Sequence, residues 1–107
     1  MRLWIHFAKE NPMRYLSHLD LMRAWQRAIR RARLPVAYSA GFNPHPKMSF
    51  ASALAVGVTS ETEYLDIELQ EDVGDEDLNR LRTALPTGLP MMKWRVVPQA
   101  IPALMSL

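Results

Sequence analysis

The stretch "LSHLDLMRAWQRAIRRARLP", residues 16–35, specifies the first helix and with it the frame of the fold. Ser17 and Asp20 stand three residues apart, the spacing of a capping box in which the serine oxygen accepts hydrogen bonds from first-turn amides and the acid reaches back to the serine amide. Pro35 is expected to stop the helix. Between these limits, apolar residues recur at helical spacing, at Leu21, Trp25, Ala28, Ile29 and Ala32.

Strands are predicted on both sides of this helix. Residues 2–9 and 63–69 alternate between apolar and polar with period two, and residues 91–97 read as a final strand. Residues 36–38 are short, apolar and compatible with a strand, and residues 48–58 read as an irregular one. The alternation places Trp4, His6 and Tyr64 on outward strand faces.

A second helix is predicted to have Asp75 as its N-cap and to bury a leucine stripe. The order strand, helix, strand, strand, helix, strand consists of two split βαβ units. It predicts an α+β, ferredoxin-like βαββαβ fold, an antiparallel sheet with two helices on one face. We assign residues 1–98 to this domain. The tail "QAIPALMSL", residues 99–107, reads like the first turn of another helix, so we expect a truncated second half or a partner that completes the domain.

The composition excludes several classes of protein. The 107 residues contain no cysteine, so this chain offers no thiol nucleophile, no disulfide and no cysteine-ligated iron–sulfur cluster. No apolar run reaches the length of a membrane span, and the N-terminus lacks the apolar stretch of a signal peptide. We therefore expect a cytoplasmic protein without a membrane partner.

Charge is divided unevenly along the chain. Residues 1–50 hold nine basic and two acidic residues, a net charge of +7, whereas residues 51–107 hold four basic and nine acidic residues, a net charge of −5. No carboxylate occurs from residue 21 to residue 60. The first helix carries an almost unmixed set of basic residues there, which favours phosphate contact over an ordinary solvated face. The alternative is pairing with the acidic region 61–77. The basic set comprises Arg23, Arg27, Arg30, Arg31 and Arg33.

A stiff loop follows the first helix in the stretch "YSAGFNPHPKMSF", residues 38–50. Gly41 permits a positive φ, and the two prolines of "NPHP" fix two φ angles. We expect the loop to hold Asn43, His45 and Lys47 outward for contact with phosphates or bases. The alternative is a structural crossover whose polar groups satisfy the backbone.

The histidines and aromatic residues allow further hypotheses. His45 is a candidate general base for metal-free RNA cleavage, with Lys47 or an arginine as the second group. His6, His18 and His45 have no compact ligand spacing, so we expect no metal site. Trp4, His6 and Tyr64 offer a base-stacking platform, or a surface that packs on the second half; we expect the packing.

Several motifs are similar to those of the radical SAM-linked family of bacterial proteins. They are "LSHLD" at 16–20, "LP" at 34–35, "YS" at 38–39, "GFNPHP" at 41–46, "SF" at 49–50 and "EYLD" at 63–66. The resemblance implies a partner or fusion of cobalamin-binding radical SAM proteins, in some cases beside ribonuclease E/G-type proteins. It implies an RNA-linked setting but no particular reaction. The chain has no Cys-x-x-x-Cys-x-x-Cys, so a radical SAM cluster would belong to another chain.

The sequence therefore predicts an RNA-binding or substrate-presenting accessory module that works with a radical SAM enzyme or a ribonuclease, with no cofactor in this chain. Phosphates would be held by Arg23, Arg27, Arg30 and Arg31, and the target would be contacted by Asn43, His45 and Lys47. Two alternatives stay open. One is a metal-independent RNA-processing enzyme that uses His45, and the other is a protein-interaction subunit that docks an acidic partner.

Overall fold

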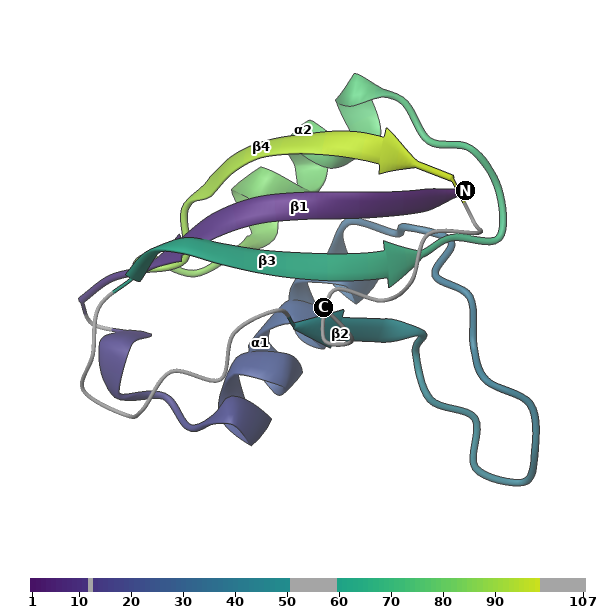
Figure 1. Ribbon diagram of the computed structural model, residues 1–107, viewed down its shortest axis with the longest axis horizontal. Helices are drawn as coiled ribbons and strands as arrows, with labels where there is room; N and C mark the ends of the chain where they lie inside the picture. Colours follow the sequence, from purple (N-terminus) through teal and green to yellow (C-terminus); the bar gives the residue numbers. More distant parts are fainter. Residues whose placement is uncertain (12, 51–59, 99–107) are drawn as a thin grey trace.

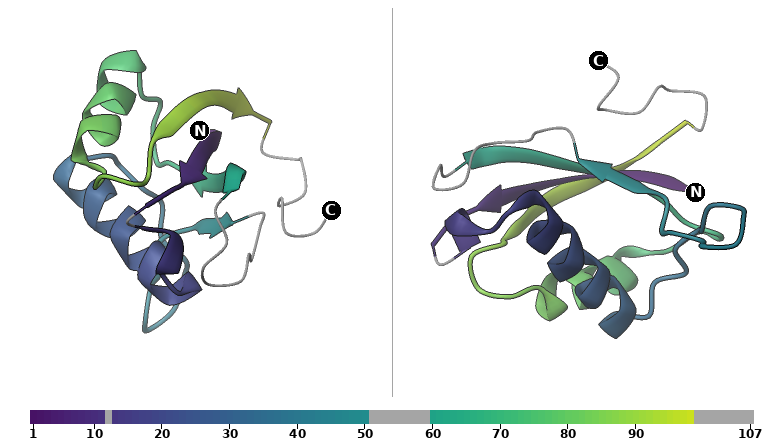
Figure 2. Two further views of the ribbon diagram at one scale, coloured as in Figure 1. Left: turned by 90° about the vertical axis from the view of Figure 1, so that its left-hand side faces the viewer. Right: turned by 90° about the horizontal axis from the view of Figure 1, so that it is seen from below.

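The computed structural model describes residues 1–11, 13–50 and 60–98. A four-stranded sheet has the order β2-β3-β1-β4, and all of its neighbouring strands are antiparallel. Two helices cover one face of the sheet (Figures 1 and 2). This strand order confirms the predicted ferredoxin-like fold. The elements are β1 (Arg2–Lys9), a 3-10 turn η1 (Met13–Tyr15), α1 (His18–Arg31), β2 (Met48–Phe50), β3 (Ser60–Glu68), α2 (Asp75–Ala84) and β4 (Met91–Val97).

The N-terminal end of α1 has the predicted serine cap. Ser17 is the N-cap, and its hydroxyl oxygen accepts a hydrogen bond from the backbone N–H of Asp20 at 3.2 Å. The second half of the predicted capping box differs: the Asp20 carboxylate accepts from the Ser17 hydroxyl at 3.1 Å rather than from the Ser17 amide. The Ser17 hydroxyl thus accepts the N–H of Asp20 and donates to the carboxylate of the same residue.

The C-terminal end of α1 lies earlier than the expected stop at Pro35. The helix ends at Arg31, and Arg33 follows with a positive φ of 59°. The Arg33 N–H donates to the carbonyl of Arg30 at 3.1 Å, and the Leu34 N–H donates to the carbonyl of Ile29 at 3.2 Å. These two bonds form a Schellman motif, which closes the helix before the proline is reached.

The core lies between the sheet and the helices. Trp25 of α1 is fully buried, and its ring meets that of Phe7 of β1 edge-on with centroids 4.9 Å apart. Phe50 of β2 completes the aromatic cluster, 6.0 Å from Phe7. The predicted apolar face of α1 is buried in full: Leu21, Trp25, Ala28, Ile29 and Ala32.

Some predicted boundaries differ from those in the structure, and others fall outside the described residues. Gly74, not Asp75, is the N-cap of α2, because the carboxylate of Asp77 accepts the Gly74 N–H at 3.0 Å. Residues 36–38 form isolated bridges, Val36 to Leu69 and Tyr38 to Pro46, rather than a strand. Residues 51–58 of the irregular strand and the tail 99–107 lie outside the described part of the chain. No described helix is long and apolar enough to cross a membrane.

Candidate functional site

The loop after α1 is a narrow hairpin that projects from the body of the domain (Figure 1). The Ser39 N–H donates to the carbonyl of His45 at 2.9 Å, and the His45 N–H donates to the Ser39 hydroxyl at 3.0 Å. Gly41 at the tip has a φ of +114°, the positive φ that the sequence predicted. These bonds and the two prolines restrict the conformations that the loop can adopt.

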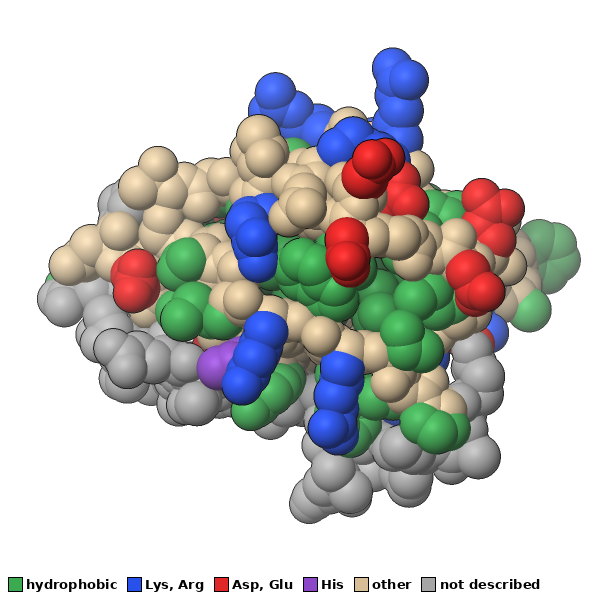
Figure 3. All heavy atoms as spheres, turned by 90° about the horizontal axis from the view of Figure 1, so that it is seen from above, with side chains coloured by type: hydrophobic (Ala, Val, Ile, Leu, Met, Phe, Trp, Pro, Cys, Tyr) green, Lys and Arg blue, Asp and Glu red, His purple; other side chains and the backbone are tan. Residues whose placement is uncertain are grey.

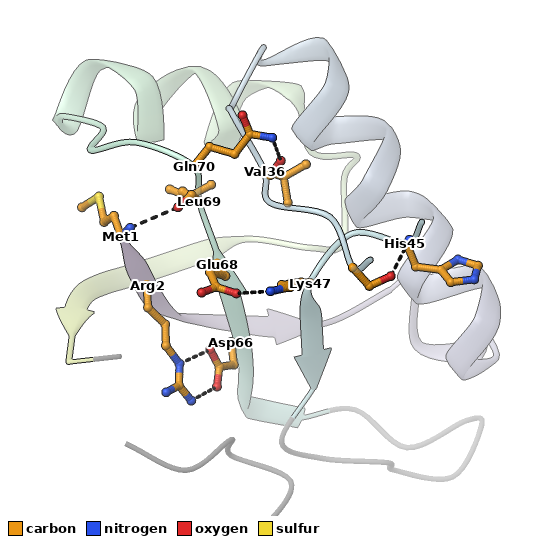
Figure 4. Close-up of polar contacts among 10 residues, drawn as sticks. Met1, Arg2, Val36, His45, Lys47, Asp66, Glu68, Leu69 and Gln70 are labelled. Carbon is orange, nitrogen blue, oxygen red and sulfur yellow. Dashed lines mark hydrogen bonds and ion pairs between the residues drawn. The ribbon is translucent and has the colours of Figure 1, made fainter. Parts of the chain in front are cut away.

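The base of this hairpin is fastened to β3. The Lys47 N–H donates to the carbonyl of Ala37 at 2.8 Å, and the Glu68 N–H donates to the carbonyl of Lys47 at 3.0 Å. The Lys47 ammonium also lies 3.4 Å from a carboxylate oxygen of Glu68 (Figure 4). Strand pairing thus brings an acid from outside the carboxylate-free stretch to Lys47.

The side chains of His45 and Lys47 point in different directions. Figure 4 shows the Lys47 side chain directed at Glu68 and the imidazole of His45 directed away from it. His45 and Asn43 are both exposed.

The arginines of α1 remain largely unmatched by acids. The four arginines of α1 and Arg33, which follows it, are exposed, and among them Arg23 alone forms an ion pair, with Asp20 at 3.8 Å. Among the side chains that the structure describes, no ion pair to a carboxylate within 4.0 Å is formed by Arg27, Arg30, Arg31 or Arg33. The acidic region instead pairs Asp66 with Arg2 and Asp77 with Arg80. These four arginines therefore form no direct ion pair with the acidic region among the described side chains, although Arg31 and Glu76 line one surface hollow.

A hollow of about 390 Å³ lies between the C-terminal half of α1 and the loop, and we call it the α1–loop hollow. Arg30 and Arg33 contribute its basic groups, and Tyr38, Pro44 and Pro46 contribute its loop side. Its remaining lining is Gln26, Ile29, Leu34 and Val36. The sequence prediction did not include Tyr38 as a site residue; the signal available was an aromatic residue beside the proline-rich turn.

The face of the sheet that the helices do not cover carries a second hollow, of about 400 Å³, which we call the outer hollow. His6 and Tyr64 stack with centroids 5.0 Å apart, and the Arg95 guanidinium lies 5.5 Å from the centroid of the Trp4 ring. Lys93 and Trp94 complete the described lining. Figure 3 shows basic side chains beside a histidine on this side of β4. The structure therefore brings together the three aromatic residues that the alternation placed outward.

Asp66 also lies on this outer face but is not exposed. Arg2 Nε donates to Oδ1 of Asp66 at 2.9 Å, and Nη2 donates to Oδ2 at 2.6 Å (Figure 4). The hydrogen bond to Asp66 raises the pKa of Arg2 above its usual value. The pair is a structural link between β1 and β3, because both side chains are engaged with each other.

The three histidines lie on separate parts of the domain. His6 is in the outer hollow, His18 stands edge-on to Phe50 at 5.6 Å, and His45 is in the loop. Among the described residues, no group of three or more histidine, aspartate or glutamate side chains is arranged to hold a metal ion.

Comparison with known proteins assigns the chain to a bacterial family. The family model described as "Uncharacterized protein conserved in bacteria (DUF2344)" matches residues 2–107. The chain belongs to this family. No curated protein and no solved structure matches the sequence.

Proposed function

We propose that this chain is an RNA-binding module that presents RNA to a partner enzyme. The observation that carries the proposal is that three exposed arginines of α1 have no carboxylate in ion-pair range among the described side chains. Arg2, Lys47 and Arg80 each have a carboxylate within 4.0 Å, whereas the described structure provides none for Arg27, Arg30 or Arg31. Exposed cations without acidic neighbours are the usual means of holding a phosphate backbone.

The proposed partner is a radical SAM enzyme or a ribonuclease E/G-type protein, and the motif resemblance supports this choice. The role in that assembly is binding rather than catalysis. The ring of His45 is exposed and points away from Lys47, one of the second groups that the sequence suggested beside an arginine, and this geometry supports binding. Asn43 and His45 would contact the RNA from the loop, beside the phosphates held by α1.

The test is RNA affinity measured as a function of salt. Replacing Arg27 and Arg31 by Ala is expected to weaken binding to a labelled RNA and to reduce the salt slope by about 1 for each phosphate that the variant no longer holds. Fluorescence anisotropy over a salt series measures both quantities, and gel analysis of the same samples shows whether the RNA stays intact.

A matched control removes two positive charges elsewhere. Lys93 and Arg95 lie on the outer face, and their double replacement by Ala makes the same change in net charge. We expect this control to leave the slope close to that of the unmodified chain. Equal losses in the two variants would mean that net charge alone drives binding, and an unchanged α1 variant would remove the arginines from the site. RNA cleavage that disappears in His45→Ala would replace the binding role by an enzymatic one.

A further inference from the structure

We propose that the α1–loop hollow holds one unpaired nucleotide of single-stranded RNA, with its base against Tyr38 and its phosphate between Arg30 and Arg33. The inference rests on the proposed RNA-binding function and adds the class of RNA and the place where a base is held. It follows from the charge, the shape and the rigidity of one hollow.

The described lining of the hollow contains positively charged side chains and no acidic residue. Arg30 and Arg33 both line it, and neither has a carboxylate within 4.0 Å among the described residues. The loop wall contributes Pro44 and Pro46, which carry no charge. An anion that entered would meet two guanidinium groups and no acid, which suits a phosphate diester.

The shape suits a nucleotide rather than a bare anion. The volume of about 390 Å³ lies in the range of small-ligand sites, and the lining includes apolar groups from Ile29 and Val36. Tyr38 is 52% exposed, so part of its ring is available to a ligand. An aromatic ring next to arginines is the arrangement on which unpaired bases stack.

Hydrogen bonds within the chain hold the backbone of both walls of the hollow without a ligand. On the loop side, Ser39 and His45 exchange two hydrogen bonds across the hairpin. On the helix side, Arg33 occupies the positive-φ position of the Schellman motif, where glycine is the usual residue. A side chain kept at a strained position is a reason to look for a function of that side chain. Preformed walls also reduce the conformational entropy that binding would cost.

Stacking on Tyr38 would let the hollow bind single-stranded RNA in preference to a duplex. In a duplex the faces of the bases are covered by their neighbours, so Tyr38 reaches only an unpaired base. Phosphate contact alone would favour the duplex, because its charge density is higher. The proposal therefore predicts tighter binding to the single strand, whereas phosphate contact by the arginines alone would favour the duplex.

The experiment compares one RNA of about ten nucleotides as a single strand and annealed to its complement, at one salt concentration. The probe carries 2-aminopurine, whose fluorescence falls on stacking, and an end label for anisotropy. We expect the single strand to bind at least about tenfold more tightly, with quenching. Tyr38→Ala is expected to lower single-strand affinity about tenfold, to abolish the quenching and to leave the salt slope unchanged, whereas Tyr38→Phe retains both affinity and quenching.

The control replaces another partly exposed tyrosine. Tyr64→Ala changes the outer face and is expected to leave affinity and quenching unchanged. Circular dichroism of each variant establishes that it is folded. If Tyr64→Ala removes the quenching and Tyr38→Ala does not, the base lies in the outer hollow and the proposal is overturned.

The remaining outcomes separate this proposal from the one on which it rests. Binding that depends on Arg27 and Arg31 but is equal for duplex and single strand, and unaffected by Tyr38→Ala, keeps RNA binding and refutes the nucleotide site. No binding to either RNA refutes both. A titration with free AMP and UMP identifies the source of the nucleotide: affinity equal to that of the oligonucleotide would show a mononucleotide site and contradict the RNA assignment.

Discussion

Arg2 and Asp66 form a two-point ion pair whose side chains are only 10% and 7% exposed. Replacing Asp66 by Ala would leave a buried guanidinium without its carboxylate. Because water cannot fully replace that carboxylate at a buried position, we expect the free energy of unfolding to fall by about 3 kcal/mol. Urea denaturation followed by circular dichroism measures this change.

Glu68→Ala is the matched control for that variant. Glu68 lies on the same strand and pairs with Lys47, but the two side chains are 31% and 49% exposed. An exposed pair contributes little, so we expect the free energy of unfolding to fall by less than about 1 kcal/mol. Equal decreases for the two variants would contradict the argument from burial.

Arg33 combines a strained backbone with a proposed role in phosphate binding. Its φ of 59° suits glycine, so Arg33→Gly is expected to raise the free energy of unfolding by about 0.5–1 kcal/mol. The same variant is expected to bind RNA more weakly, because one guanidinium leaves the α1–loop hollow. Urea denaturation and anisotropy on one preparation measure both effects. A variant that is more stable and binds RNA equally well would show that the arginine has no part in binding.

The first turn of α2 contains Asp77, an acid whose protonation is expected to change the stability of the domain. The Asp77 carboxylate accepts hydrogen bonds from the Gly74 N–H and the guanidinium of Arg80, and both bonds hold the pKa of Asp77 below its ordinary value of 3.8. A depressed pKa stabilises the folded state at pH values above the unfolded pKa, and this contribution is lost as the pH falls through the folded pKa.

Asp77→Asn is therefore expected to lower the Tm at pH 7, and the difference from the unmodified chain is expected to close below about pH 4. Thermal unfolding followed by circular dichroism at a series of pH values measures it. Asp72→Asn, at an exposed residue near the start of α2, controls for the removal of one negative charge. A Tm difference for Asp77→Asn that is constant from pH 7 down to about pH 3 would show that the carboxylate contributes nothing through its charge.

The helices and strands were predictable where their periodicity reports burial. The alternation of residues 2–9 located β1 with its bounds, and the spacing of the apolar residues of α1 located the buried face around Trp25. The ends were less predictable, because they depend on particular hydrogen bonds. Sequence alone favoured Asp75 as the cap of α2, but the neighbouring Gly74 is held by the Asp77 carboxylate and takes that place.

The candidate site was predictable only in its parts. The exposed arginines of α1 followed from their place away from the buried face. The ion pair of Lys47 with Glu68 was not predictable, because strand pairing brings together residues that are far apart in the sequence. The α1–loop hollow was not visible in the sequence, since Tyr38 and Arg33 meet there only after the hairpin folds against the end of α1.

Across the domain, the fold sorts the charges that the sequence had divided between its halves. Acids of β3 and α2 neutralise Arg2, Lys47 and Arg80. The described residues include no such partner for Arg27 or Arg31. Ion pairs therefore form at β1, β3, α2 and the first turn of α1, whereas Arg27, Arg30 and Arg31 of α1 have no carboxylate in ion-pair range among the described side chains.

Gly88 lies where the connections that follow the first strand and precede the last strand meet. Its carbonyl accepts the Glu10 N–H at 2.8 Å, and the carbonyl of Pro90 accepts the Ala8 N–H at 3.0 Å. Gly88 has a φ of +98°, and an added Cβ would lie 2.7 Å from the side chain of Met13 and 2.9 Å from the carbonyl oxygen of Glu10. We expect Gly88→Ala to reduce the free energy of unfolding by about 3 kcal/mol or more.

Substitutions at two further glycines, Gly41 and Gly74, show how much of the cost at Gly88 comes from backbone strain and how much from steric conflict. Gly41 has a φ of +114° with no atom within 4 Å of an added Cβ, so Gly41→Ala is expected to cost about 1 kcal/mol. Gly74 has a φ of −103° and similar open space, so Gly74→Ala is expected to cost about 0.5 kcal/mol. Urea denaturation of the three variants measures the series. If Gly88→Ala lowers the free energy of unfolding no more than Gly41→Ala does, the chain around Met13 and Glu10 moves easily to make room for the added Cβ. The close packing at Gly88 would then contribute little to stability.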